Sequence, residues 1–166
     1  MKPLHTPLST STVRARRTAP ARGFTAVELM VVIAIVGVLG SIAMPSFADF
    51  SVNQRLRTAT YDLMADLIYA RGEAIKRNNR VLVTRVGTNW ASGWTITDVN
   101  GIALRQHPAL DTSVTESTGP GTVTFGLDGH QVGTGTATFT FDDLKAKATI
   151  PVRKIVLDAS GRPRSS

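Results

Sequence analysis

RGFTAVELMVVIAIVGVLGSIAMPSFADF, residues 22–50, is the stretch around which the rest of the chain is organised. It becomes apolar at Phe24, contains a single acid at Glu28, and then carries no charged residue from Leu29 through Ala48. At about 1.5 Å of rise per residue, a helix over those roughly 20 residues spans about 30 Å, the thickness of the hydrocarbon core of a bilayer. The stretch therefore predicts a membrane-spanning helix.

Glu28 is the unusual residue of this stretch. An ionised side chain inside an apolar helix costs about 2.5–3.5 kcal/mol on membrane-insertion scales, so we expect a cationic partner for it. A new α-amino group at Phe24, produced by cutting after Gly23, would lie one turn away on the same helix or on the next helix of a bundle. The carboxylate thus suggests that the chain is cut in front of Phe24.

Residues 23–29, GFTAVEL, followed by an apolar run that contains Pro45, resemble the class III signal of type IV pilins and type II secretion pseudopilins. The resemblance implies that a prepilin peptidase cuts between Gly23 and Phe24 and that Phe24 is N-methylated. It also implies that Glu28 neutralises the amino terminus of a neighbouring subunit when pilins stack into a fibre. The alternative, an ordinary signal peptide or single-pass anchor, leaves Glu28 unexplained.

The basic character of the chain is concentrated before the predicted cut. The net charge is +7, but five of the 19 lysines and arginines precede Phe24: Lys2, Arg14, Arg16, Arg17 and Arg22. The remaining 14 lysines and arginines are nearly balanced by the 12 acidic residues of the chain. Positive charges before an apolar run stay in the cytoplasm, which places the C-terminal part across the membrane. The chain contains no cysteine, so the exported domain has to be stabilised by its core alone.

Helical periodicity continues after the apolar run. Residues 51–79 contain no proline, and their small and apolar side chains recur every three or four positions: Leu56, Thr60, Leu63, Leu67, Ala70 and Ala74. Charged residues are predicted on the opposite, solvent-facing side: Arg55, Asp62, Asp66, Glu73 and Lys76. Glu73 precedes Arg77 by four residues, the favourable order for a surface ion pair. One helix over 24–79 is therefore predicted, with a kink at Pro45.

Beyond Asn79 the pattern changes to short runs of β-prone residues separated by turn residues. The predicted strands are Val81–Val86, Gly93–Thr97, Ile102–Gln106, Thr122–Phe125, Thr136–Phe141 and Ile150–Leu157. Asn100-Gly101 and Asp128-Gly129 are typical of hairpin turns, and the stretches 117–121 and 132–135 are predicted as loops. An antiparallel sheet packed on the amphipathic half of the helix would bury both.

The fold class is therefore α+β, with a long N-terminal helix packed on an antiparallel β-sheet domain, and the resemblance implies the type IV pilin fold. The predicted organisation is a leader at 1–23, a transmembrane half-helix at 24–50, an amphipathic half-helix at 51–79, a β-sheet domain at 80–158 and a basic tail at 159–166.

Residues 70–78, ARGEAIKRN, followed by WASGW at 90–94, resemble the GspH/FimT group of minor pilins and pseudopilins. Two interpretations of Trp90 and Trp94 are possible. Aromatic faces can stack on nucleic-acid bases, which would make the pair a ligand platform. A tryptophan beside Gly93 can instead fill space in the core against the sheet, which is the interpretation we favour.

The C-terminus carries the second resemblance. Residues 161–164, GRPR, are similar to the tail of FimT-type (FimT/FimU) minor pilins, which act in DNA uptake during natural transformation. Gly161 lets the chain turn out of the last strand, and Arg162 and Arg164 can each direct two N–H donors at phosphate oxygens. A solvated basic tail without a ligand is the alternative. The residues that would extend this surface, if the sheet places them on the same side, are Arg153, Lys154, Lys145 and Lys147.

An enzyme is not indicated. His107 and His130 have no histidine or cysteine at ligand spacing, and Asp142-Asp143 lacks the alternating oxygen ligands of a calcium loop, so we expect no metal and no cofactor. The main hypothesis is a minor pilin that enters the inner membrane, is processed, joins other pilins in a surface fibre and binds double-stranded DNA. The alternatives are a GspH-type pseudopilin of type II secretion or a pilus-priming pilin with a structural role, and a solitary membrane-anchored domain.

Overall fold

The structure is a computed structural model that describes residues 23–133 and 135–166. The predicted leader lies outside the described residues except for Gly23, and so does Thr134 of the predicted loop at 132–135. The chain divides into two compact units, which meet between Gly40 and Ser41.

Helix α1, Ala26–Arg77, begins in the first unit, two residues later than predicted. Its large apolar side chains up to Leu39 are exposed, including Met30, Ile33 and Val36. Within the described residues no single helix meets the length and hydropathy required of a membrane span. The two helical segments Ala26–Ser41 and Ser46–Arg77, separated by a break that contains Pro45, satisfy the length and hydropathy criteria when they are taken as a pair.

In the second unit, α1 is amphipathic because its apolar residues recur on one face. Leu56, Leu63, Leu67, Ala70 and Ala74 are fully buried on that face, as predicted. The helix ends in a Schellman motif. Asn78 adopts φ 49°, its N–H donates to Ile75 O at 3.2 Å, and the Asn79 N–H donates to Ala74 O at 3.2 Å. Asparagine tolerates this left-handed conformation, which explains why the helix stops here.

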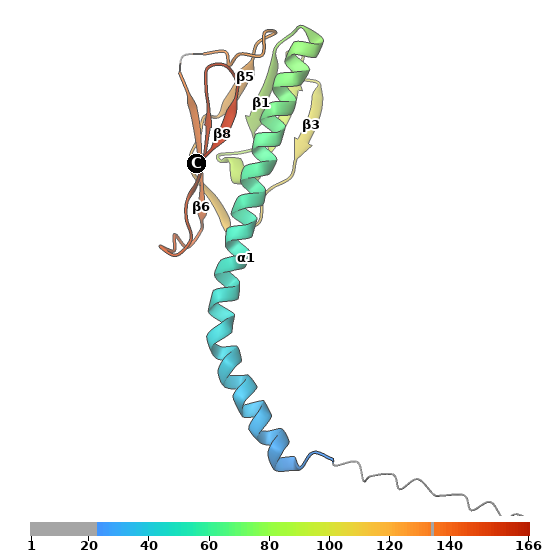
Figure 1. The fold of residues 1–166 in the computed structure, drawn as a ribbon. Helices are drawn as coiled ribbons and strands as arrows, with labels where there is room; N and C mark the ends of the chain where they lie inside the picture. Colours follow the sequence, from blue (N-terminus) through green and yellow to red (C-terminus); the bar gives the residue numbers. More distant parts are fainter. Residues whose placement is uncertain (1–22, 134) are drawn as a thin grey trace, which may run out of the picture. The chain divides into compact units, whose positions relative to one another are not determined.

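The β-strands form two four-stranded antiparallel sheets rather than the one sheet that was predicted (Figure 1). The first has the order β3-β2-β1-β5, and its strands are β1 (Val81–Arg85), β2 (Trp94–Asp98), β3 (Ala103–His107) and β5 (Thr122–Phe125). The second has the order β4-β6-β7-β8, and its strands are β4 (Val114–Thr118), β6 (Ala137–Asp143), β7 (Arg153–Leu157) and β8 (Pro163–Ser165). The six predicted strands all exist, β5 with the predicted bounds and the other five with shifted ends, whereas β4 and β8 were missed.

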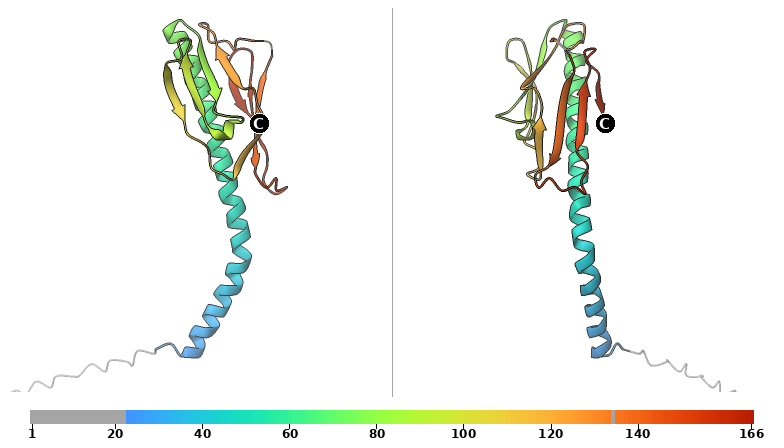
Figure 2. Two further views of the ribbon diagram at one scale, coloured as in Figure 1. Left: turned by 180° about the vertical axis from the view of Figure 1, so that it is seen from behind. Right: turned by 90° about the vertical axis from the view of Figure 1, so that its left-hand side faces the viewer.

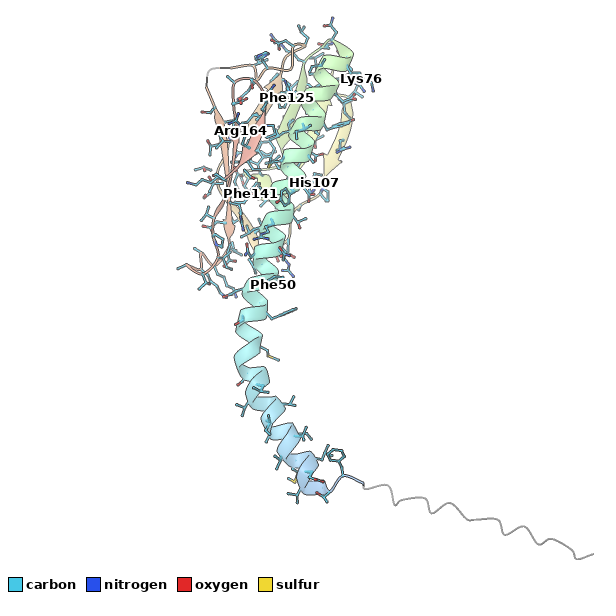
Figure 3. The ribbon with its side chains drawn as sticks, in the orientation of Figure 1. Phe50, Lys76, His107, Phe125, Phe141 and Arg164 are labelled. Carbon is cyan, nitrogen blue, oxygen red and sulfur yellow. The ribbon has the colours of Figure 1, made fainter. Side chains whose placement is uncertain are left out.

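Both sheets lie along the C-terminal half of α1 (Figure 2), and the core fills the space between them and the helix. Trp90, in the 3-10 helix Trp90–Ser92, joins the two sheets because its ring meets Phe139 edge-on at 5.0 Å and Trp94 at 6.1 Å. Both tryptophans are fully buried, so they are core residues and the ligand-platform interpretation is wrong. Phe125 and Phe141 are buried in the same core (Figure 3).

Two acids predicted on the solvent side of α1 are buried instead. Asp66 is 4% exposed because it accepts hydrogen bonds from Trp94 Nε1 at 2.8 Å and from the Arg105 guanidinium at 2.7 Å. Glu73 is 8% exposed and forms the predicted ion pair with Arg77 at 2.6 Å, as well as one with Lys76 at 3.4 Å. Both carboxylates lie at the margin of the buried face, where cationic partners and a tryptophan N–H satisfy them.

Candidate nucleic-acid interface

The predicted basic tail is not a free tail, because the chain reverses after β7 and returns along it as β8. The turn is built by Asp158, whose carboxylate accepts hydrogen bonds from the Ser160 hydroxyl at 2.6 Å and from the Arg162 N–H at 2.9 Å. Gly161 adopts φ +76° and donates its N–H to Asp158 O at 2.9 Å. The prediction that Gly161 turns the chain out of the last strand is therefore confirmed, but the turn leads into a hairpin.

β8 is the edge strand of its sheet, and its register explains the position of Pro163. Val156 pairs with Arg164 and Leu157 with Pro163. The ladder hydrogen bonds join Lys154 to Ser166 and Asp158 to Arg162. Because these bonds alternate along an antiparallel pair, the backbone N of Pro163 is directed away from β7, where its missing N–H costs nothing.

Arg164 and Lys154 share the outer face of this sheet. Ile155 and Leu157 are fully buried on the inner face of β7, so Lys154 and Val156 lie on the outer one, and the Val156–Arg164 pairing places Arg164 beside them. Figure 3 labels Arg164 on this sheet. Lys154, Arg162 and Arg164 are all exposed, and among the described residues none of them forms a salt bridge.

The other three predicted basic residues are not on this face. Arg153 lies on the inner side of β7, where its guanidinium donates to Asn53 Oδ1 on α1 at 3.1 Å. Lys147 forms an ion pair with Asp49 at 2.5 Å, which raises the pKa of the lysine and compensates its charge. Lys145 is exposed in the loop between β6 and β7. Only Lys154 therefore extends the arginine pair in the way that was proposed.

Two further arginines of α1 were not predicted here: Arg71 lies close to the turn before β8, and Arg57 lies close to β8 itself. Arg71 donates from Nε to Gly129 O at 3.0 Å, and its Cδ lies beside Gly161. Arg57 is exposed and lines a cavity with Arg153, Ser165 and other residues of α1 and β8. No sequence signal indicated either contact, because both join α1 to turns and strands far along the chain.

Asp158 is the one acid within the β7–β8 turn. Hydrogen bonds from the Ser160 hydroxyl and from the Arg162 N–H, together with the nearby charge of Arg164, hold the pKa of Asp158 below its ordinary value. The carboxylate thus stays ionised at neutral pH. Its Oδ1 accepts the two hydrogen bonds that shape the turn, and its charge offsets part of the positive charge of the outer face.

The predicted processing site lies at the start of α1. Gly23 and Phe24 are exposed and precede the helix. Glu28 belongs to the first turn and forms a capping box: its Oε2 accepts from the Thr25 N–H at 2.9 Å and from the Thr25 hydroxyl at 3.0 Å, while Thr25 Oγ1 accepts from the Glu28 N–H at 3.2 Å. The T-x-x-E spacing before an apolar run is the sequence signal for this cap, which was not predicted.

The two histidines among the described residues, His107 and His130, have local partners. His107 stacks on Trp94 with ring centroids 4.0 Å apart and lies 3.5 Å from Asp62, and His130 lies 3.1 Å from Asp128 within the turn after β5. Within residues 23–133 and 135–166, no group of three or more histidine, cysteine or acidic side chains is placed to hold a metal ion.

Residues 59–161, more than half of the chain, match the family model described as Type II transport protein GspH. The chain belongs to this GspH family. The predicted resemblance to the GspH/FimT group is therefore confirmed. The matched region covers the C-terminal part of α1, both sheets except β8, and the turn up to Gly161.

Solved structures similar to this GspH-family chain are type IV minor pilins and pseudopilins. The type IV minor pilin FimU of Pseudomonas aeruginosa has a TM-score of 0.61 at 24% identity, over 70% of this chain and 92% of that one. The minor pseudopilin EpsH from the Type 2 Secretion System of Vibrio cholerae has a TM-score of 0.53 at 10% identity, over 68% of this chain and 96% of that one. The predicted type IV pilin fold is thereby confirmed.

Curated relatives of the GspH-family chain match over a shorter segment. The type IV major pilin protein PilA of Myxococcus xanthus is 46% identical over 44 residues, which are 26% of this chain and 20% of that protein. A fimbrial protein of Pseudomonas aeruginosa is 39% identical over 44 residues, or 29% of its length. The chain thus spans less than a third of these relatives' length. The similarity between these pilins and the chain is limited to that short segment.

Proposed function

We propose that this pilin-like protein is a FimT-type minor pilin that binds extracellular double-stranded DNA through the outer face of the β7–β8 hairpin, for uptake in natural transformation. The observation that supports the proposal is the grouping of exposed Lys154 and Arg164 on one sheet face, with exposed Arg162 in the adjoining turn, all three without salt-bridge partners among the described residues. Guanidinium groups pair with phosphate oxygens through two parallel N–H donors, so such a face recognises a nucleic-acid backbone.

Binding of this kind is independent of base sequence and sensitive to salt. Each phosphate contact contributes about 0.9 to the slope of log affinity against log salt concentration. Three cations give low affinity for one copy of the chain, and Asp158 lowers it further. Several copies in one fibre would raise the affinity by avidity, because the second contact becomes intramolecular.

The test uses the full chain in detergent micelles and a fluorescently labelled DNA duplex. The Arg162→Ala/Arg164→Ala protein is expected to bind at least about tenfold more weakly, with a salt slope lower by about 1.8. The matched control, Lys76→Ala/Lys145→Ala, removes two exposed charges elsewhere and leaves Glu73 paired with Arg77. Equal affinity of the arginine variant and the control would refute a specific role for the hairpin.

We further propose that prepilin peptidase cuts between Gly23 and Phe24, that Phe24 is N-methylated, and that Glu28 pairs with the amino terminus of a neighbouring pilin. On this proposal the chain is first a single-pass protein of the inner membrane with its C-terminal domain in the periplasm, and then a subunit of the fibre. The exposed Gly23–Phe24 bond and the capped carboxylate one turn away support it. Mass spectrometry of the protein from its native membrane tests it, since an intact bond after Gly23 would contradict the cut.

A second candidate function is a minor pseudopilin of type II secretion, or a pilus-priming pilin, with a structural role alone. The description of the matched family and the fold of EpsH support it. A deletion strain separates the two, because loss of secretion with normal transformation supports the pseudopilin and the converse supports the DNA-binding pilin. Neither function involves catalysis by this chain.

A further inference from the structure

A second cluster of cations lies on the other side of β8, between that strand and α1. There a cavity of about 260 Å³ is lined by Arg57, Thr60, Tyr61, Arg153, Ser165 and Ser166. The lining contains two guanidinium groups and no aspartate or glutamate. One water takes up about 30 Å³ in the liquid, so the cavity has room for a small anion together with water.

One donor atom of a residue that lines the cavity lacks an acceptor. Arg153 Nε is buried and has no hydrogen-bond partner among the described residues, although the guanidinium is fixed by its bond to Asn53 Oδ1 at 3.1 Å. A buried N–H without an acceptor costs about 1–3 kcal/mol, more when it belongs to a charged group. A ligand with acceptor oxygens beside this guanidinium would offset part of that cost by neutralising its charge.

Arg57 supplies the second charge. It is exposed, and within residues 23–133 and 135–166 it forms no hydrogen bond or salt bridge, so it is available to a ligand in the cavity. Thr60 donates its hydroxyl to Leu56 O at 2.7 Å and is occupied. The hydroxyls of Tyr61 and Ser165 have no partner among the described residues, which leaves two neutral donors beside the two guanidinium groups.

We infer that the cavity binds a phosphate group, held by Arg57 and Arg153 and by the hydroxyls of Tyr61 and Ser165. A tetrahedral dianion or a phosphodiester presents several acceptor oxygens, which match two guanidinium groups and two hydroxyls. Because Lys154 on β7 and Arg164 on β8 lie on the opposite face of the same sheet, a DNA backbone seated here would place adjacent phosphates along both sides of β8. In this respect the inference rests on the proposed function.

The first measurement concerns the phosphate group alone. Amide resonances of Ser165 and Ser166 in the full, isotope-labelled chain in micelles are followed as inorganic phosphate replaces chloride at constant ionic strength. A saturable shift in the wild-type protein that is lost in Arg57→Gln supports the site. No shift in the wild-type protein, or the same shift in Arg57→Gln, overturns it whatever the DNA measurements show.

The second measurement identifies the source of the phosphate. In duplex titrations, Arg57→Gln is expected to weaken binding several-fold and to lower the salt slope by about 0.9, while Arg57→Lys recovers part of the affinity and Lys76→Ala has no effect. If Arg162→Ala/Arg164→Ala weakens binding but Arg57→Gln does not, the cavity is excluded from the DNA contact and the proposed function stands. If the wild-type protein binds phosphate but no duplex, the cavity is a site for free phosphate and the proposed function fails.

Discussion

Gly161→Ala tests whether the β7–β8 hairpin depends on a close backbone contact. Gly161 has φ +76°, and a Cβ built there would lie far inside van der Waals distance of Gly129 O, as well as 3.2 Å from Phe125 Cε1. The left-handed conformation costs an alanine about 1–2 kcal/mol. The overlap with a backbone oxygen forces one turn to move, at a further cost of about 1–3 kcal/mol. The variant is therefore expected to lose about 2–5 kcal/mol of stability.

Gly101→Ala is the matched control, because Gly101 has φ +79° and no heavy atom within 4 Å of its built Cβ. It carries the conformational cost alone, about 1–2 kcal/mol. Thermal unfolding of the full chain, followed by near-UV circular dichroism of the buried tryptophans, should show a clearly lower Tm for Gly161→Ala than for Gly101→Ala. Equal Tm values for the two variants would refute the packing of the Gly161 turn on the Gly129 turn.

Two further predictions concern carboxylates at the core: buried Asp66, and half-buried Glu116 on β4, which accepts a hydrogen bond from the Trp90 N–H. Asp66→Ala leaves the buried Trp94 N–H without its acceptor, while half-exposed Arg105 can turn to water. The variant should therefore lose about 2–3 kcal/mol of unfolding free energy, measured by chemical denaturation. Asp66→Asn keeps an acceptor and should lose less, so equal losses of stability in the two variants would contradict this explanation. Burial raises the pKa of Glu116, so its ionised form destabilises the fold at neutral pH. Glu116→Gln should therefore raise the Tm at pH 7, and this gain in Tm should shrink as the pH falls toward the ordinary pKa of 4.5. A gain in Tm that does not change with pH would exclude the burial of the charged carboxylate as its cause.

The elements predicted correctly are those whose buried residues recur in the sequence with the period of a helix or a strand. The helix was predicted from apolar spacing, and strands such as β1 from alternation that the burial of Val81 and Val83 reproduces. β4 was missed because only Val114 of its residues is buried, and β8 because it has three residues and includes Pro163. Both are edge strands, which exist through pairing with β6 and β7 rather than through their own composition.

The same distinction applies to the candidate site. The exposed arginines of the hairpin were predicted from local residues, since a glycine turn and alternate side chains are properties of a short segment. The environment of Arg153 was not predictable, because Asn53, 100 residues earlier, decides that the guanidinium lies on the inner side of β7. Asp66 was assigned to solvent for the corresponding reason, since its partners Trp94 and Arg105 are 28 and 39 residues away.

The family assignment and the DNA proposal depend on different residues. The matched region ends at Gly161, so Arg162 and Arg164 lie beyond it, and the family assignment does not depend on them. The two also depend on different physics, since the fold is stabilised by a buried core whereas phosphate binding follows exposed charge and weakens with salt. The arginine variant should therefore unfold at the wild-type temperature while losing affinity for the duplex. A variant that lost both would show that the hairpin supports the fold, and its weaker binding would then carry no information about phosphate contacts.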